Sequence, residues 1–382
     1  MKQNKKPLVV VVDDEPDIVR YEFELKLESE LGNRLRVKVD HPRDIEESLL
    51  KDADLVLVDF KIEKWCERDK QPVSLKPATG LALATVLREQ VDDAMEAGRQ
   101  TAFALHTAHL KSIKGRLPSA IAEHVVARLN NLEWVFQKTE EGRYNQMVIL
   151  ADAVRQLPSE WPSDFAESAA IVKRMLALES YSGSSDRCWR DVQECRVPIH
   201  SSVEDRRGIL FLRWLLHEIM PYPTFLWAAH WVAARLGICV SDLHEVLRGE
   251  SQLADELNSM RYLGILSGFM GDRWWCGALE DYVWELAGAG GDEGEVLHES
   301  LEKRAGMDLT PIDTNPAVVC LSERFEPTGQ FMSPLTAVRI RPDHWPAFAD
   351  SAWTDVETVR DNLFLLPMVD PLYQHHIDLG IE

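Results

Sequence analysis

The stretch LVVVVDDE, residues 8–15, decides the fold of this 382-residue chain. A leucine and four valines form an uninterrupted apolar run that stops abruptly at three acids. A run of this kind is typical of a strand that is buried on both faces, as the strands of parallel sheets are. The helical pattern that follows, over residues 16–29, indicates a strand and helix with the acids at the carboxyl end of the strand.

Three later segments repeat this pattern, and each stops at a polar side chain. They are DLVLV (54–58) before Asp59, AFALH (102–106) before Thr107 and EWVFQ (133–137) before Lys138. Helical patterns separate them at residues 81–90 and 121–129. This alternation of strands and helices predicts an α/β fold built on a doubly wound parallel sheet.

The ends of these strands carry a coherent set of chemical groups, namely Asp13, Asp14, Asp59, Thr107 and Lys138. In open α/β sheets the ligand site lies at the carboxyl ends of the strands, so we expect these side chains to converge. Three neighbouring carboxylates repel one another unless a cation joins them, and oxygen ligands suit Mg²⁺. A lysine and a hydroxyl beside such an ion can bind phosphoryl oxygens while one carboxylate accepts the phosphoryl group.

Five segments within residues 7–145 together resemble the receiver domain of two-component response regulators. They are VVVVDDEPDIV, DLVLVDF, KPATGLALATVLRE, ALHTA and WVFQK, in that order. The resemblance implies a flavodoxin-like fold in which Asp59 accepts a phosphoryl group from a histidine kinase. It also implies Mg²⁺ held by Asp13, Asp14, Asp59 and the backbone carbonyl of Lys61. Thr107 would be the switch hydroxyl and Lys138 the phosphate-binding lysine.

The segment departs from the family pattern in several places, among them an extended stretch after Thr107. The loop over residues 61–79 is longer and more charged than in compact members. Val135 occupies the position where the family usually has a switching aromatic residue, and Thr139 stands where it has a proline. The residues expected to support phosphoryl transfer to Asp59 are therefore all present. The aromatic side chain whose rotation usually propagates the signal in this family is not.

Charge divides the chain into two parts of different character. Residues 1–150 hold 23 Lys and Arg against 26 Asp and Glu, a net charge of −3, and residues 151–382 hold 19 against 37, a net charge of −18. Ten of the 12 tryptophans also lie in the second part. We therefore expect a receiver at 1–145, connecting helices and a linker at 146–200, with a polar break at 182–186, and an acidic, tryptophan-rich, mainly helical domain at 201–382.

A small β element is expected near the end of the chain. The segments AVVCLS (317–322) and TAVRI (336–340) have strand character, and FEPTGQFMSP between them is rich in turn residues. This pattern predicts a hairpin in which the first segment pairs with the second.

The second part leaves three functions open. Residues 225–248 have the spacing of a helix-turn-helix, which would make the chain a DNA-binding transcription regulator, but the second helix is acidic and the net charge of −18 opposes contact with phosphates. An enzyme with an unrecognised site is another alternative, although no familiar catalytic motif is present. We favour a non-enzymatic module that binds a protein partner or buffers phosphoryl groups. A receiver without a recognisable output domain resembles the phosphoryl-buffering receivers of some two-component systems, including ones described in bacterial phage defence.

Apolar runs and cysteine spacing indicate where in the cell the chain is found. No window approaches 18 uninterrupted apolar residues, which argues against a membrane partner. The six cysteines are scattered without paired spacing, which favours a reducing cytoplasm.

Overall fold

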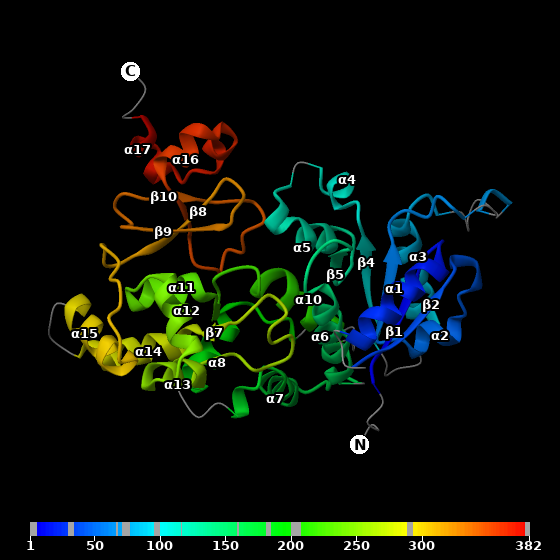
Figure 1. Cartoon of the computed structure of the whole chain (residues 1–382), viewed down its shortest axis with the longest axis horizontal. Coiled ribbons are helices and arrows are strands. Elements are labelled where there is room, and N and C mark those ends of the chain that lie inside the picture. The colour runs from blue at the N-terminus through cyan, green and yellow to red at the C-terminus, as the bar shows by residue number, and fades with distance from the viewer. Residues whose placement is uncertain are drawn as a thin grey trace. The chain divides into compact units, whose positions relative to one another are not determined.

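The computed structural model describes residues 6–29, 34–65, 68–70, 77–94, 100–115, 117–158, 160–180, 185–199, 208–288 and 293–378. The chain divides into two compact units, coloured from blue to red along the chain in Figure 1. The first comprises residues 1–175 and 198–217, and the second comprises residues 176–197 and 218–382. Of the break expected at 182–186, residues 182–184 lie outside the described residues.

The first unit is built on a five-stranded parallel sheet. Its strands are β1 (Leu8–Val12), β2 (Arg36–Asp40), β3 (Leu55–Asp59), β4 (Ala102–Thr107) and β5 (Trp134–Gln137). They lie in the order β2-β1-β3-β4-β5, and every neighbouring pair is parallel. The predicted α/β class and parallel sheet are confirmed, and this strand order fits a flavodoxin-like fold.

Strand β2 was not among the segments that the apolar runs predicted. Its sequence, RVKVD, alternates valine with charged residues, and only Val39 is buried. The strand lies at the edge of the sheet and pairs with β1 alone. A half-exposed edge strand needs no continuous apolar run, so a search for such runs passes over it.

Helices cover both faces of this sheet. They include α1 (Pro16–Ser29), α2 (Glu47–Asp52), α3 (Gly80–Ala94), α4 (Leu110–Lys114), α5 (Ser119–Leu129) and α6 (Arg143–Gln156). On one face, apolar residues of α2, α3 and α5 form a single buried cluster with alternate residues of β1 and β3. Helix α1 contacts β2, and α6 contacts β3 and β4. The unit also contains α7 (Phe165–Met175) and α10 (Ile209–Trp214).

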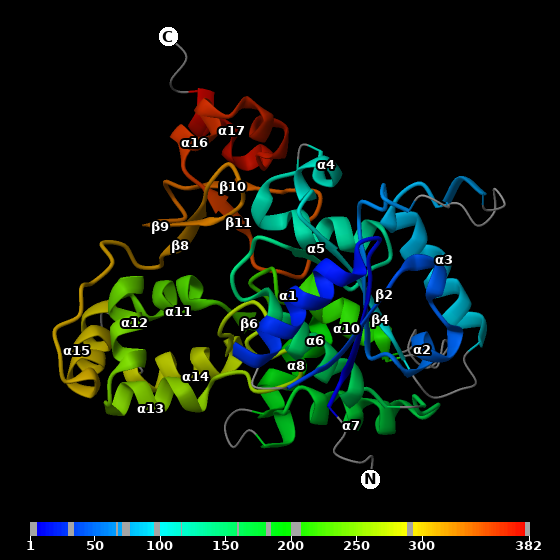
Figure 2. The same ribbon diagram turned by 45° about the vertical axis from the view of Figure 1, so that its right-hand side comes forward.

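The second unit is mainly helical. Its longer helices are α8 (Ser185–Glu194), α11 (Ala229–Leu236), α12 (Val240–Arg248), α13 (Gln252–Ser259), α14 (Cys276–Ala287) and α15 (Glu293–Ala305). Figure 2 shows α11 to α15 packed in one group. The short strands β6 (Leu226–Trp227) and β7 (Trp274–Trp275) pair antiparallel within it. Trp274 and Trp275 are buried, so part of the tryptophan excess belongs to the core.

Helices α11 and α12 are joined by a short turn, as the helix-turn-helix spacing predicts. Gly237 ends α11 in the left-handed region at φ 71°, which glycine adopts without a steric penalty. Ala233 and Leu243 are buried where the two helices pack. On α12, Asp242 accepts a hydrogen bond from the backbone of Thr310, so this acid holds a neighbouring segment of the same unit.

A four-stranded mixed sheet lies toward the end of the chain. Its strands are β8 (Val318–Leu321), β9 (Pro327–Met332), β10 (Val338–Ile340) and β11 (Ala352–Thr354), in the order β10-β11-β8-β9. The predicted hairpin was wrong in its pairing, because β8 pairs with β9 and β10 pairs with β11. The expected turn itself forms β9. Its proline, glycine and polar residues are tolerated there because β9 is an exposed edge strand.

Two shorter helices, α16 (Val356–Asp361) and α17 (Gln374–Asp378), follow this sheet. Over the described ranges, we find no helix with both the length and the apolar character needed to cross a membrane.

Candidate functional site

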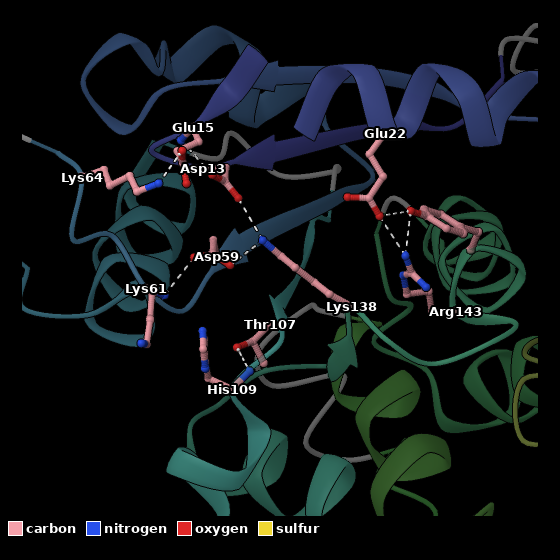
Figure 3. Close-up of polar contacts among 11 residues, drawn as sticks. Asp13, Glu15, Glu22, Asp59, Lys61, Lys64, Thr107, His109, Lys138 and Arg143 are labelled. Atoms are coloured by element: carbon pink, nitrogen blue, oxygen red, sulfur yellow. Dashed lines mark hydrogen bonds and ion pairs between the residues drawn. The ribbon is translucent and has the colours of Figure 1, made fainter. Parts of the chain in front are cut away.

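The carboxyl ends of β1, β3 and β5 bring three of the expected side chains together. The ammonium of Lys138 lies 2.8 Å from a carboxylate oxygen of Asp59 and 3.1 Å from one of Asp13 (Figure 3). Each residue immediately follows or ends its strand, and the strand order makes β1 and β3 neighbours. One cation is therefore shared by two carboxylates at the carboxyl ends of the parallel strands.

Backbone donors fix both carboxylates in place. The second oxygen of Asp59 accepts a hydrogen bond of 2.9 Å from the N–H of Lys61, and Asp13 accepts one of 2.8 Å from Glu15. Both aspartates are buried, with 7% and 3% of their surfaces exposed. Lys61 thus contributes its backbone N–H to Asp59. Fixed carboxylates of this kind present an oxygen nucleophile in a constant direction.

Burial and neighbouring charges have opposing effects on the pKa values of Asp59 and Lys138. Burial raises the pKa of Asp59, and the negative charge of Asp13 adds to that rise, against the opposing effect of Lys138. Burial alone would lower the pKa of Lys138, but its hydrogen bond and charge interaction with Asp59 outweigh burial and raise that pKa. The lysine therefore stays cationic, and the crowded carboxylates have an unmet need for positive charge.

Asp14 also follows the carboxyl end of β1, but its carboxylate is hydrogen-bonded to the loop after β3 and not to Lys138. Its carboxylate accepts a hydrogen bond from the backbone N–H of Lys64, and the side chain of Lys64 forms a 2.6 Å ion pair with Glu15. Burial raises the pKa of Asp14, and the charge of Asp13 contributes. The third expected carboxylate is thus held by the loop that follows β3.

Thr107 is fully buried at the end of β4. Its hydroxyl oxygen accepts a 2.9 Å hydrogen bond from the backbone N–H of His109, as Figure 3 shows. This bond uses the oxygen as an acceptor and leaves the hydroxyl hydrogen available as a donor. The backbone N–H of Lys138 donates a 2.9 Å hydrogen bond to the carbonyl oxygen of Thr107. Among the interactions of the described residues, the hydroxyl of Thr107 has no hydrogen bond with the side chain of Asp59 or Lys138.

The carboxylates at this site provide the oxygen ligands that Mg²⁺ prefers. Across the described ranges, no three His, Cys, Asp or Glu side chains stand close enough together to hold a metal ion. Asp13 and Asp59 converge, whereas Asp14 is turned to Lys64. The residues fit Mg²⁺ in their chemistry, because all are oxygen ligands in a site short of positive charge, provided that Asp14 turns away from Lys64.

Glycine is required where α3 begins beside this site. A Cβ atom at position 80 would lie 1.6 Å from the carbonyl oxygen of Asp59, and the N–H of Gly80 donates a 2.8 Å hydrogen bond to Phe60. The start of α3 thus packs directly on the end of β3.

Gly80→Ala is expected to lower the free energy of unfolding by about 1–3 kcal/mol, the usual cost of overpacking. The added methyl group must displace backbone atoms, which cannot rotate away as a side chain can. Urea denaturation of the full chain measures the change, with Glu89→Ala, an exposed position on the same helix, as the control. Equal stability of the two variants would show that α3 can move at no cost.

Two buried ionisable side chains of the first unit were not predicted, one beside the site and one at the other end of the strands. His106 is fully buried beside Thr107, packs edge-on against Phe23 at 5.6 Å, and is kept neutral because burial lowers its pKa. Glu133, at the start of β5, accepts hydrogen bonds from Arg88 and Arg213. In the sequence, each is a titratable residue inside or next to an apolar run. That position predicts burial but does not predict which residues the side chain contacts.

Comparison of the sequence with models of protein families gave no match, and no curated protein proved similar to it.

Proposed function

We propose that the first unit is a receiver of the response-regulator type, in which Asp59 accepts a phosphoryl group from the phosphohistidine of a histidine kinase. The observation that carries this proposal is the ammonium of Lys138, shared between Asp13 and Asp59 at the carboxyl edge of the sheet. A nucleophilic carboxylate, a second acid and a cation at one point are the parts that phosphoryl transfer to a carboxylate needs.

The proposed reaction begins with the fixed carboxylate of Asp59. One oxygen of Asp59 forms a bond to phosphorus as the bond from phosphorus to the kinase imidazole breaks, and the electron pair returns to that ring nitrogen. Lys138, 2.8 Å from this carboxylate, is placed to neutralise the phosphoryl oxygens. The hydroxyl of Thr107, oriented by the N–H of His109, can donate its hydrogen to one of them.

Asp13, Asp14, Asp59 and the carbonyl of Lys61 would hold Mg²⁺, which when bound offsets the negative charge of the acids and the phosphoryl group. The raised pKa values of Asp14 and Asp59, caused first by burial, support a site that gains from an added cation.

The proposal is tested by incubating the full chain with acetyl phosphate and Mg²⁺ and locating the product by mass spectrometry. We expect one acid-stable, hydroxylamine-sensitive acyl phosphate on the peptide that contains Asp59. A phosphoryl group on a histidine, serine or threonine, or none at all, would contradict the proposal.

Lys138→Met is expected to slow phosphorylation by acetyl phosphate about 100-fold, the typical effect of removing one preorganised charge donor. Losing the ammonium also raises the pKa of Asp59 further, so the acid limb of the rate should move to higher pH. Initial rates across a pH series measure both effects. Lys111→Met, an exposed lysine on α4, is the control, and a rate for Lys138→Met within threefold of it would remove this lysine from the mechanism.

We propose further that the second unit passes on the signal by binding a protein partner, or that the chain buffers phosphoryl groups in the cytoplasm without an output reaction. Exposed apolar side chains near the end of the chain, at Leu363, Phe364 and Leu372, support a protein contact. The acidity of residues 151–382 disfavours nucleic acid as that partner. Competition with a second receiver for one kinase distinguishes buffering from signalling.

A further inference from the structure

The second unit contains a surface cavity of about 390 Å³ that the proposed receiver chemistry does not use. It is bordered by the first residues of α11, the last turn of α12 and the segment before β7. The ionisable side chains that line it are mostly basic and comprise His230, His244, Arg248, Arg261, Arg273 and Asp272. Basic residues thus gather in one hollow within a part of the chain that carries a net charge of −18.

The contacts of these side chains leave positive charge in excess. Asp272, the single acid of the lining, forms an ion pair with Arg261. The guanidinium of Arg273 donates hydrogen bonds to the carbonyls of Asp272 and Met220, which fix it without neutralising it. Arg248 is exposed at the end of α12 and has no ion pair with any residue of the described ranges. The charge of Asp272 also acts on Arg273, so one acid faces three arginines and the lining keeps an excess of positive charge.

Burial makes this excess of positive charge unfavourable. It lowers the pKa of Arg273 to about 10, at which the side chain is still cationic at neutral pH. Burial also lowers the pKa of His230, and the nearby His244 adds to this effect. An anion in the cavity would relieve both penalties at once.

A helix terminus adds to the same potential. Ala228 and Ala229 line the cavity at the start of α11, and no side chain caps this end of the helix. The first N–H groups of a helix lack partners within it, and the helix dipole places partial positive charge there. Backbone donors and arginines together are the usual surroundings of a bound phosphate.

We infer that this cavity binds a small molecule carrying a phosphate group, up to the size of a mononucleotide, through Arg248, Arg273 and the start of α11. A cavity of this volume lies at the lower end of the range for small ligands, about 300–1,000 Å³. A phosphate carries nearly two negative charges at neutral pH, which matches the excess of three arginines over one acid better than a single carboxylate does. The surrounding acidity repels a long polyanion but acts less on a small one inside the cavity.

Isothermal titration of the full chain with AMP, in low salt and with EDTA to keep Mg²⁺ away from Asp59, tests this inference. We expect AMP to bind, adenosine to give no signal, and inorganic phosphate to compete with AMP. Arg248→Gln should weaken AMP binding at least tenfold, because it removes an exposed charge with no structural partner. Arg324→Gln, an exposed arginine outside the cavity, is the matched control and should leave affinity unchanged.

Three results would overturn the inference. One is no binding of AMP or phosphate at millimolar concentration, and another is equal binding of AMP and adenosine. The third is a short DNA duplex that binds more tightly than AMP and loses affinity in Arg248→Gln, which would make the cavity part of a nucleic acid surface. The inference is independent of the receiver proposal, because none of these measurements involves phosphorylation of Asp59.

Discussion

Replacing Asp59 by asparagine is expected to abolish phosphorylation of the chain by acetyl phosphate or by a kinase. The amide keeps the shape of the carboxylate, and its oxygen can still accept the hydrogen bond from Lys61. It cannot form an acyl phosphate, because an amide oxygen is a far weaker nucleophile than a carboxylate. Incorporation of radiolabelled phosphate measures the loss, and Asp44→Asn, an exposed acid before α2, serves as the control.

The same variant should fold at least as well as the wild type. Burial raises the pKa of Asp59 above its ordinary value, so the folded state binds this proton more tightly than the unfolded chain does. The ionised carboxylate therefore lowers stability at neutral pH, and a neutral amide removes that penalty. Loss of phosphorylation together with unchanged thermal unfolding would assign the effect to chemistry. Label retained in Asp59→Asn would place the acceptor at another residue.

Glu133→Gln is expected to cause a large loss of stability in the first unit, about 3–5 kcal/mol. Glu133 is fully buried, with Arg88 2.8 Å from one carboxylate oxygen and Arg213 2.7 Å from the other. The backbone N–H of Phe103 donates to the same carboxylate. Without the negative charge, two arginine side chains remain close together with no counter-ion.

The pH dependence of unfolding provides a second measurement of this interaction. Burial alone would raise the pKa of Glu133, but the charges of Arg88 and Arg213 outweigh it and lower that pKa to about 2. A depressed pKa contributes stability above its unfolded value, near 4.5, that is lost as pH falls toward about 2. Urea denaturation between these pH values should show a steeper slope in the wild type than in Glu133→Gln. Glu141→Gln, an exposed acid in the following turn, should keep the wild-type slope, and an equal slope in all three proteins would exclude a contribution from Glu133.

The strands that carry the site could be predicted because each is a continuous apolar run ended by a polar residue. Burial on both faces of a parallel sheet demands such runs, and the fixed geometry of the sheet then gathers Asp13, Asp59 and Lys138 at one edge. Convergence in this case depends on strand order and not on side-chain detail. The convergence of these residues, which lie 46 to 125 positions apart in the sequence, could therefore be predicted.

The contacts that could not be predicted depend on segments without a periodic pattern. Asp14 is held by Lys64 in a loop whose course no local signal determines. Glu133 meets arginines 45 and 80 residues away, one of them in a helix beyond the five-stranded sheet. The error in the pairing of β8 has a similar origin, because Pro327 and Gly329 are turn residues that an edge strand also accepts.

Gly80 separates the requirements of folding from those of function. A relative of this chain that had lost Asp59 or Lys138 could keep its sheet, as a receiver reduced to a docking module would. A relative with any side chain at position 80 would collide with the carbonyl of residue 59, whatever that residue is. Under the receiver proposal, this glycine should therefore persist in relatives that have lost the acids, and it would identify them after the proposed phosphoryl-accepting residues are gone.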